Sequence, residues 1–148
     1  MSTPSPTIQA VEGSLAWRGS EIAQTPGWHY VMNASEIAEV QAALAACAEL
    51  PRDSVTAGTF PLPTLSARLR DLRQILESGV GSCLLGGWPT EDHDVATNER
   101  VFWGLSHHLG TAISQSAQGE KIFHVRDSGF KMGHPKARGP NTSRGLSF

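Results

Sequence analysis

Apolar residues recur at helical spacing between residues 33 and 50. One helical face collects a set of positions three and four residues apart: Ile37, Val40, Leu44, Cys47 and Ala48. Asn33 stands where an N-cap would, and Glu36 follows at the spacing of a capping box. Pro51 cannot continue a helix. The pattern therefore predicts a helix that starts after Asn33 and ends before Pro51.

Two more stretches show the same periodicity. Thr64 is the expected cap of a second helix, which Gly79 ends. Its apolar face is formed by leucines at spacings of four, three and four: Leu65, Leu69, Leu72 and Leu76. Its arginines, Arg68, Arg70 and Arg73, lie on the other faces and favour a solvated surface. A third helix is predicted from about Glu91 to Leu109, with its inward positions at Val95, Phe102, Leu105 and Leu109.

Short apolar runs between these helices predict strands. They occupy residues 29–32, 80–85 and 121–126, and glycines bound the second run, which is typical of a buried strand. Residues 128–145 form a long Gly- and Pro-containing loop, and long loops in compact domains are usually functional or disordered. Residues 1–14 are polar and Pro-rich, so we expect a disordered N-terminal arm followed by one domain over 15–148.

Composition excludes several classes of function. The net charge is −2 and the pI is about 6.3, which gives no overall electrostatic reason to bind nucleic acid or an anionic membrane. No apolar run approaches the length of a membrane-spanning helix, and no secretory signal precedes Leu15. Cys47 and Cys83 lack metal-ligand spacing and indicate buried free thiols in a reducing compartment. We therefore expect a cytoplasmic protein.

The chain contains no complete catalytic constellation. None of its six histidines is followed two positions later by Asp or Glu, and His107 and His108 point about 100° apart if they lie on a helix. A serine-hydrolase elbow and a phosphate-binding loop are also absent from the sequence. We accordingly predict no metal ligands and no catalytic residues within residues 1–148.

The order of several landmarks carries more information than any one of them. They are Trp17-Arg18-Gly19, Trp28-His29-Tyr30, Phe60-Pro61-Leu62-Pro63, residues 79–89, Phe102-Trp103-Gly104-Leu105, residues 115–119 and Val125-Arg126-Asp127. Over residues 15–148 this series resembles the N-terminal half of a TauD/TfdA-like Fe(II)/2-oxoglutarate-dependent dioxygenase. Two departures occur: the family's usual arginine before Gly-Leu-Pro is missing from the run Leu85-Gly86-Gly87-Trp88-Pro89, and Pro140 follows Arg138-Gly139 in place of an aromatic residue.

The resemblance implies an α+β fold in which N-terminal helices pack on part of a double-stranded β-helix (jelly-roll) core that is incomplete in this chain. It also implies Fe(II) and 2-oxoglutarate as cofactors of the intact enzyme, a small organic substrate, and a His-x-Asp metal motif just beyond Phe148. On this interpretation, the candidate substrate contacts are Gln115 and three residues that lead toward the metal motif, Asn141, Thr142 and Ser143.

Two alternatives remain open at this point. The 148 residues could be a complete, non-catalytic binding or interaction module of the same fold, and the exposed edge of its unclosed sheet would then favour a homodimer. The positive charge of residues 131–144 could instead attract an anion, although the segment is too short and too rich in Gly and Pro for a nucleic-acid site.

Overall fold

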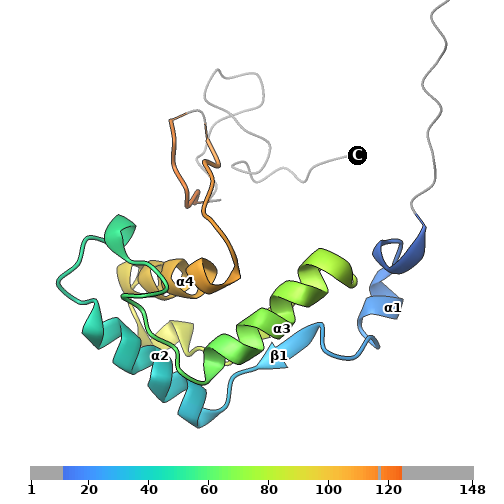
Figure 1. Cartoon of the computed structure of the whole chain (residues 1–148), viewed down its shortest axis with the longest axis horizontal. Helices are drawn as coiled ribbons and strands as arrows, with labels where there is room; N and C mark the ends of the chain where they lie inside the picture. The colour runs from blue at the N-terminus through green and yellow to red at the C-terminus, as the bar shows by residue number, and fades with distance from the viewer. Residues whose placement is uncertain (1–11, 117, 125–148) are drawn as a thin grey trace, which may run out of the picture. The chain divides into compact units, whose positions relative to one another are not determined.

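The computed structural model of the protein describes residues 12–116 and 118–124. The chain divides into two compact units, Met1–Thr111 and Ala112–Phe148, and the described helices and strands all lie in the first (Figure 1). In chain order they are η1 (Gly13–Leu15), α1 (Gly19–Ile22), β1 (His29–Val31), α2 (Ala34–Ala46), η2 (Arg52–Ser54), α3 (Leu65–Ser78), β2 (Leu84–Gly86), η3 (Thr90–Asp92) and α4 (Val95–Leu109). Among the described residues, no helix combines the length and apolar character needed to cross a membrane.

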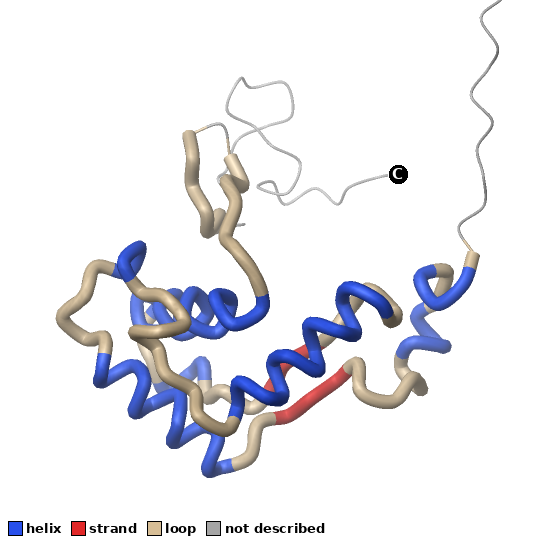
Figure 2. Tube along the Cα trace, in the orientation of Figure 1, coloured by secondary structure: helices blue, strands red, loops and turns tan. Residues whose placement is uncertain are grey.

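The two strands pair in parallel and form a two-stranded sheet (Figure 2). His29 lies opposite Leu84, and Val31 lies opposite Gly86. Helices together with this small sheet agree with the predicted α+β class, whereas the jelly-roll core stays a prediction. The strand predicted over residues 29–32 is confirmed as β1.

The second strand is shorter and less buried than predicted. Only Leu84–Gly86 is a strand, and its residues are half-buried or exposed. Residues 80–83 cannot extend it, because the chain is still turning after α3. Gly81 has a φ of +71° and donates its N–H to the Ile75 carbonyl, while the Val80 carbonyl accepts a hydrogen bond from the Trp17 indole.

Helix α2 begins with the predicted capping box. The Asn33 side chain accepts hydrogen bonds from the backbone N–H groups of Ser35 and Glu36, and the Glu36 carboxylate accepts one from the Asn33 N–H. The buried face consists of Glu36, Val40, Ala43 and Cys47. Of the predicted inward set, Val40 and Cys47 are buried, Ile37 and Leu44 are half-buried, and Ala48 is exposed.

Helix α3 buries Leu65, Leu69 and Leu72, as its periodicity predicts. Leu76, the fourth position, is exposed. The Thr64 side chain makes no cap hydrogen bond; instead, the Glu39 carboxylate from α2 accepts the backbone N–H groups of Thr64 and Leu65. A side chain from a neighbouring helix therefore caps α3, which a local pattern does not reveal.

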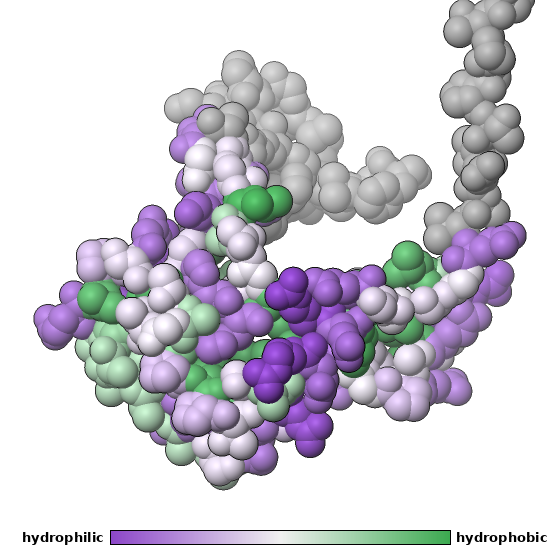
Figure 3. Space-filling view, viewed as in Figure 1, coloured by the Kyte–Doolittle hydropathy of each residue, from purple (hydrophilic) through white to green (hydrophobic). Residues whose placement is uncertain are grey.

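The exposed side of α3 carries the arginine cluster, as predicted. Arg68, Arg70 and Arg73 are all exposed, and this side of the helix is strongly hydrophilic in Figure 3. Arg68 pairs with Asp71 at 3.7 Å, and Arg73 pairs with Glu77 at 2.7 Å. Exposed pairs of this kind add little stability, so the cluster is mainly a solvated surface.

Helix α4 starts later than predicted and buries a different face. A short 3-10 turn covers residues 90–92, and Asp94 caps the helix by accepting the Thr97 N–H at 2.7 Å. The predicted inward positions were wrong, because Val95 and Phe102 are both 61% exposed, and Leu105 and Leu109 are half-buried. The face that packs on the core is Val101, Trp103 and Gly104.

Two contacts select this face of α4. A Cβ at position 104 would lie only 2.6 Å from the Phe60 ring, so glycine lets the helix and the ring approach closely. The Trp103 indole donates to the Val55 carbonyl at 3.1 Å. Phe60 and Val55 both belong to the loop before α3 and are fully buried, so α4 holds this loop in the core.

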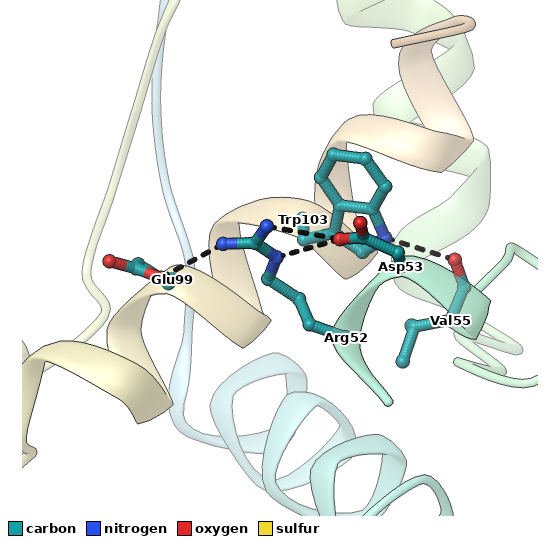
Figure 4. A network of polar contacts seen from close by, with 5 residues as sticks. All are labelled: Arg52, Asp53, Val55, Glu99 and Trp103. Carbon is teal, nitrogen blue, oxygen red and sulfur yellow. Dashed lines mark hydrogen bonds and ion pairs between the residues drawn. The ribbon is translucent and has the colours of Figure 1, made fainter. Parts of the chain in front are cut away.

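A polar network secures the same loop (Figure 4). The Arg52 guanidinium forms ion pairs with Asp53 at 3.0 Å and with Glu99 of α4 at 3.1 Å. It also lies 5.6 Å from the centre of the Trp103 ring, within the range of a cation–π interaction. The network thus joins η2 to the helix that covers it.

The second unit departs from the sequence prediction. The strand predicted over residues 121–126 was wrong for 121–124, which are irregular, while 125 and 126 lie outside the described residues. A strand needs the backbone ladder of a neighbouring strand. The described residues of this unit contain no strand that could supply it.

Candidate functional site

The loop that follows α4 contains Gln115, the first predicted substrate contact. It closes on itself around Ser116, whose hydroxyl accepts hydrogen bonds from the backbone N–H groups of Gln118 and Glu120. The Gln115 N–H donates to the Glu120 carbonyl at 2.6 Å. Gly119 has a φ of +85°, a conformation that favours glycine and allows the chain to reverse. The backbone at Gln115 is therefore fixed by local bonds.

The Gln115 side chain is exposed at the surface of this loop. Its amide donates to the Ile113 carbonyl at 3.3 Å, a long and local hydrogen bond that holds the group only weakly. The other three predicted contacts, Asn141, Thr142 and Ser143, lie outside the described residues. Whether the four side chains share a pocket accordingly stays a prediction.

Three histidines of the first unit contact aromatic rings or backbone. His93 stacks on Trp88 with ring centres 4.6 Å apart, and His107 meets the Trp103 ring edge-on at 4.8 Å. The His108 Nε2 lies 2.9 Å from the Phe60 carbonyl. In the part of the chain that the structure describes, no three His, Cys, Asp or Glu side chains are grouped to hold a metal ion. These residues therefore do not fit an iron site.

A hollow of about 130 Å³ lies between β1 and α3 and was not predicted from the sequence. Residues 27, 29 and 30 and the α3 residues Arg68, Asp71, Leu72 and Ile75 line it. The Tyr30 hydroxyl donates to the buried Glu36 carboxylate at 2.6 Å, and the Arg68 guanidinium lies 5.6 Å from the centre of the Tyr30 ring. Tyr30 and Arg68 are far apart in the chain, so no local pattern links them. The arginine cluster on α3 was the one sequence feature that pointed to this region.

The electrostatics of this hollow leave its tyrosine in the neutral, protonated form. The hydrogen bond to Glu36, followed by burial, raises the pKa of Tyr30 above its ordinary value. The phenol therefore stays protonated at neutral pH and acts as a hydrogen-bond donor. Burial likewise raises the pKa of the Cys83 thiol, which lowers its reactivity as a nucleophile. Neither group is activated for catalysis.

Comparison with known proteins gives two related sequences. The chain is 28% identical over 144 residues to FR-33289 synthase from Streptomyces rubellomurinus, covering 93% of this chain and 42% of that protein. It is 28% identical over 116 residues to the taurine hydroxylase-like protein SAT17 from Stachybotrys chartarum, covering 76% of this chain and 30% of that protein. No protein-family profile matches the chain.

The chain thus spans less than half the length of the curated relatives it matches. Both matches support the relationship to TauD-like proteins that the order of sequence landmarks predicts.

Proposed function

We propose that this chain, a relative of TauD-like proteins, is the N-terminal portion of an Fe(II)/2-oxoglutarate-dependent oxygenase that oxidises a small organic substrate. The observation that carries the proposal is the 28% identity to FR-33289 synthase over 144 residues, which extends across 93% of this chain. The second match, to a taurine hydroxylase-like protein, points to the same class of enzyme.

The parallel sheet supports the view that the described fold is part of a larger one. Tyr30 points toward α3, so the side chain of the next residue, Val31, lies on the opposite face of the sheet. Val31 is 56% exposed and Leu84 is 47% exposed. Parallel sheets are normally covered on both faces and rarely contain only two strands. In our proposal, β1 and β2 join the sheet of a jelly-roll core.

In this proposal, the residues of this chain and the rest of the enzyme have different roles. Bound iron and 2-oxoglutarate would supply the oxidative decarboxylation that is coupled to oxidation of the substrate. We place the metal ligands beyond Phe148, since the described residues do not fit an iron site. This chain would contribute packing and part of the substrate pocket, through Gln115 and the residues 141–143. A cytoplasmic location is part of the proposal, because Cys47 and Cys83 are free thiols.

Reading the coding sequence after Phe148 and measuring cofactor binding test this proposal. We expect a His-x-Asp motif directly downstream, and we expect the full-length protein to bind Fe(II) and 2-oxoglutarate stoichiometrically in calorimetric titrations under anaerobic conditions. The polypeptide 1–148 should bind neither. Stoichiometric binding by 1–148 would contradict the placement of the ligands, and a full-length protein without binding would contradict the enzyme class.

The second candidate is a non-catalytic binding module of the same fold. Among the described residues, no further strand pairs with the edges of the two-stranded sheet and its Val31 side is partly exposed, which favours this candidate because such edges pair readily with other chains. A stop codon after Phe148 and a concentration-dependent dimer in sedimentation experiments are its expected results. A strictly monomeric 1–148 chain in those experiments would count against pairing through the sheet edge.

A further inference from the structure

The hollow between β1 and α3 has a largely apolar wall. Tyr30 of β1 and Leu72 and Ile75 of α3 line it. Gly27 takes part in the wall without a side chain, and a Cβ at that position would lie 3.4 Å from the Ile75 Cδ1 atom. The volume of about 130 Å³ is close to that of a cavity that holds a benzene ring, about 150 Å³. The hollow therefore has room for one medium-sized apolar group.

Two opposite charges stand beside this apolar wall. Arg68 and Asp71 are neighbours on one face of α3, and both line the hollow. Their side chains are 59% and 67% exposed, and the guanidinium Nη1 lies 3.7 Å from the carboxylate Oδ2, which is too long for a hydrogen bond. An exposed pair of this kind is held only weakly. Both groups can therefore exchange each other for a ligand that carries the complementary charges.

The position of Tyr30 is fixed by hydrogen bonds outside the hollow. Its hydroxyl donates to the Glu36 carboxylate at 2.6 Å, and Glu36 is only 5% exposed. The same carboxylate accepts the Asn33 N–H at 2.9 Å, within the capping box of α2. The Arg68 guanidinium lies 5.6 Å from the centre of the Tyr30 ring, so a cation–π interaction holds the charge beside the hollow. A site that is preformed in this way loses less conformational freedom when a ligand binds.

We infer that this hollow binds a free α-amino acid with a medium-sized apolar side chain. The α-carboxylate of the ligand pairs with Arg68, its α-ammonium group pairs with Asp71, and its side chain enters the hollow. Because both charged groups of an α-amino acid are bonded to the same carbon, they suit two protein charges that lie 3.7 Å apart. The inference goes beyond the proposed function and does not depend on it, since every residue of the hollow belongs to the first unit.

The presence of both charges favours a zwitterion over a ligand with a single charge. A monocarboxylate would pair with Arg68 but would place its negative charge beside the carboxylate of Asp71. A monoamine would pair with Asp71 but would place its positive charge beside the guanidinium of Arg68. Like charges at such short range repel each other. An amino acid satisfies both groups and leaves the net charge of the site unchanged.

Titration of the 1–148 chain with L-leucine, followed by two-dimensional proton–nitrogen NMR spectra, tests the inference. We expect saturable shifts of the backbone amides of β1 and α3, with a Kd of about 1 mM or below, which is within reach of a ligand of this size. Two matched probes are isocaproate, which is leucine without the ammonium group, and isoamylamine, which is leucine without the carboxylate. Each should bind at least about fivefold more weakly than leucine, because one charge-assisted hydrogen bond is lost at a partly exposed site.

Substitutions on α3 test the two charges separately. Arg68→Gln and Asp71→Asn should each weaken leucine binding by at least about fivefold. Arg68→Gln should not weaken the binding of isoamylamine, and Asp71→Asn should not weaken that of isocaproate. The matched controls are Arg73→Gln and Glu77→Gln, which break the other exposed ion pair of α3, outside the lining of the hollow. Both controls should change the Kd for leucine by less than about twofold, and circular dichroism verifies that each variant is folded.

Three results would overturn the inference. The first is the absence of saturable shifts in the folded wild-type chain at a leucine concentration about twentyfold above the expected Kd. The second is equal affinity for leucine and isocaproate together with no effect of Asp71→Asn, which would show that the occupant is a monocarboxylate. The third is equal weakening by Arg68→Gln and Arg73→Gln, which would show that leucine responds to the general charge of α3 and does not occupy the hollow.

Discussion

The two faces of α4 are chemically alike but differ in their surroundings. On the inner face, Trp103 is 2% exposed and donates a hydrogen bond to Val55, and Gly104 touches the Phe60 ring. On the outer face, Phe102 is as apolar as Trp103 but remains 61% exposed. Apolar character alone therefore does not decide which face is buried. Shape complementarity and a satisfied polar group select the inner face.

This difference predicts that neighbouring aromatic residues on one helix contribute very unequally to stability. Trp103→Ala should lower the free energy of unfolding by about 3–5 kcal/mol, because it leaves a large cavity and removes the hydrogen bond to Val55. Urea unfolding of the 1–148 chain, monitored by circular dichroism, measures the change. Trp17→Ala is the control, since Trp17 is 40% exposed and its indole also donates to a carbonyl, that of Val80. A loss at Trp103 no larger than that at Trp17 would contradict the contrast between the faces.

A smaller effect is expected where the inner face is tightest. Gly104→Ala places a methyl group 2.6 Å from the Phe60 ring, so the helix or the ring must shift. Overpacking of this kind costs about 1–3 kcal/mol, and the higher helix propensity of alanine offsets up to about 1 kcal/mol of it. Gly110→Ala is the matched control, because a Cβ there meets no atom within 4 Å and its φ of 178° suits any residue. Urea midpoints of the two variants should differ, and equal midpoints would show that the Phe60 contact is loose.

The helices could be predicted from the sequence better than their buried faces. Local spacing predicted the capping box of Asn33 and Glu36, because those groups are three residues apart. It selected the wrong face of α4, since periodicity cannot distinguish two apolar rows on one helix. The contact that decides between them joins Gly104 to Phe60, residues that are distant in the chain.

The candidate site shows the same limit. Gln115 was chosen from its place in the landmark series; the structure places it on an exposed, locally closed turn, and its role as a substrate contact stays a prediction. The hollow between Tyr30 and Arg68 could not be predicted, because it depends on β1 and α3, which are distant in the chain, lying side by side. Long-range packing of this kind leaves no periodic signal in the chain.

A third prediction concerns Asp94, the residue that caps the N-terminus of α4. Hydrogen bonds from the Thr97 side chain and backbone lower the pKa of Asp94 below its ordinary value. A folded-state pKa below the unfolded one stabilises the protein above the unfolded pKa of about 3.9, and this contribution is lost as the pH falls through the folded value. Asp94→Asn keeps a good cap without this titration. The difference in urea midpoint between wild type and Asp94→Asn should therefore shrink between about pH 5 and about pH 3. An unchanged difference would mean that the cap charge does not stabilise α4.

The smallest effect is expected on the outer face. Phe102→Ser removes a large apolar side chain, yet in the 1–148 chain it should change the free energy of unfolding by no more than about 0.5 kcal/mol, as for most surface substitutions. Phenylalanine and serine have similar helix propensities, so the helix itself is little affected. Urea unfolding of the 1–148 chain, monitored by circular dichroism, checks this value. A large loss would show that Phe102 already packs in this chain, and would contradict the contrast between the two faces of α4.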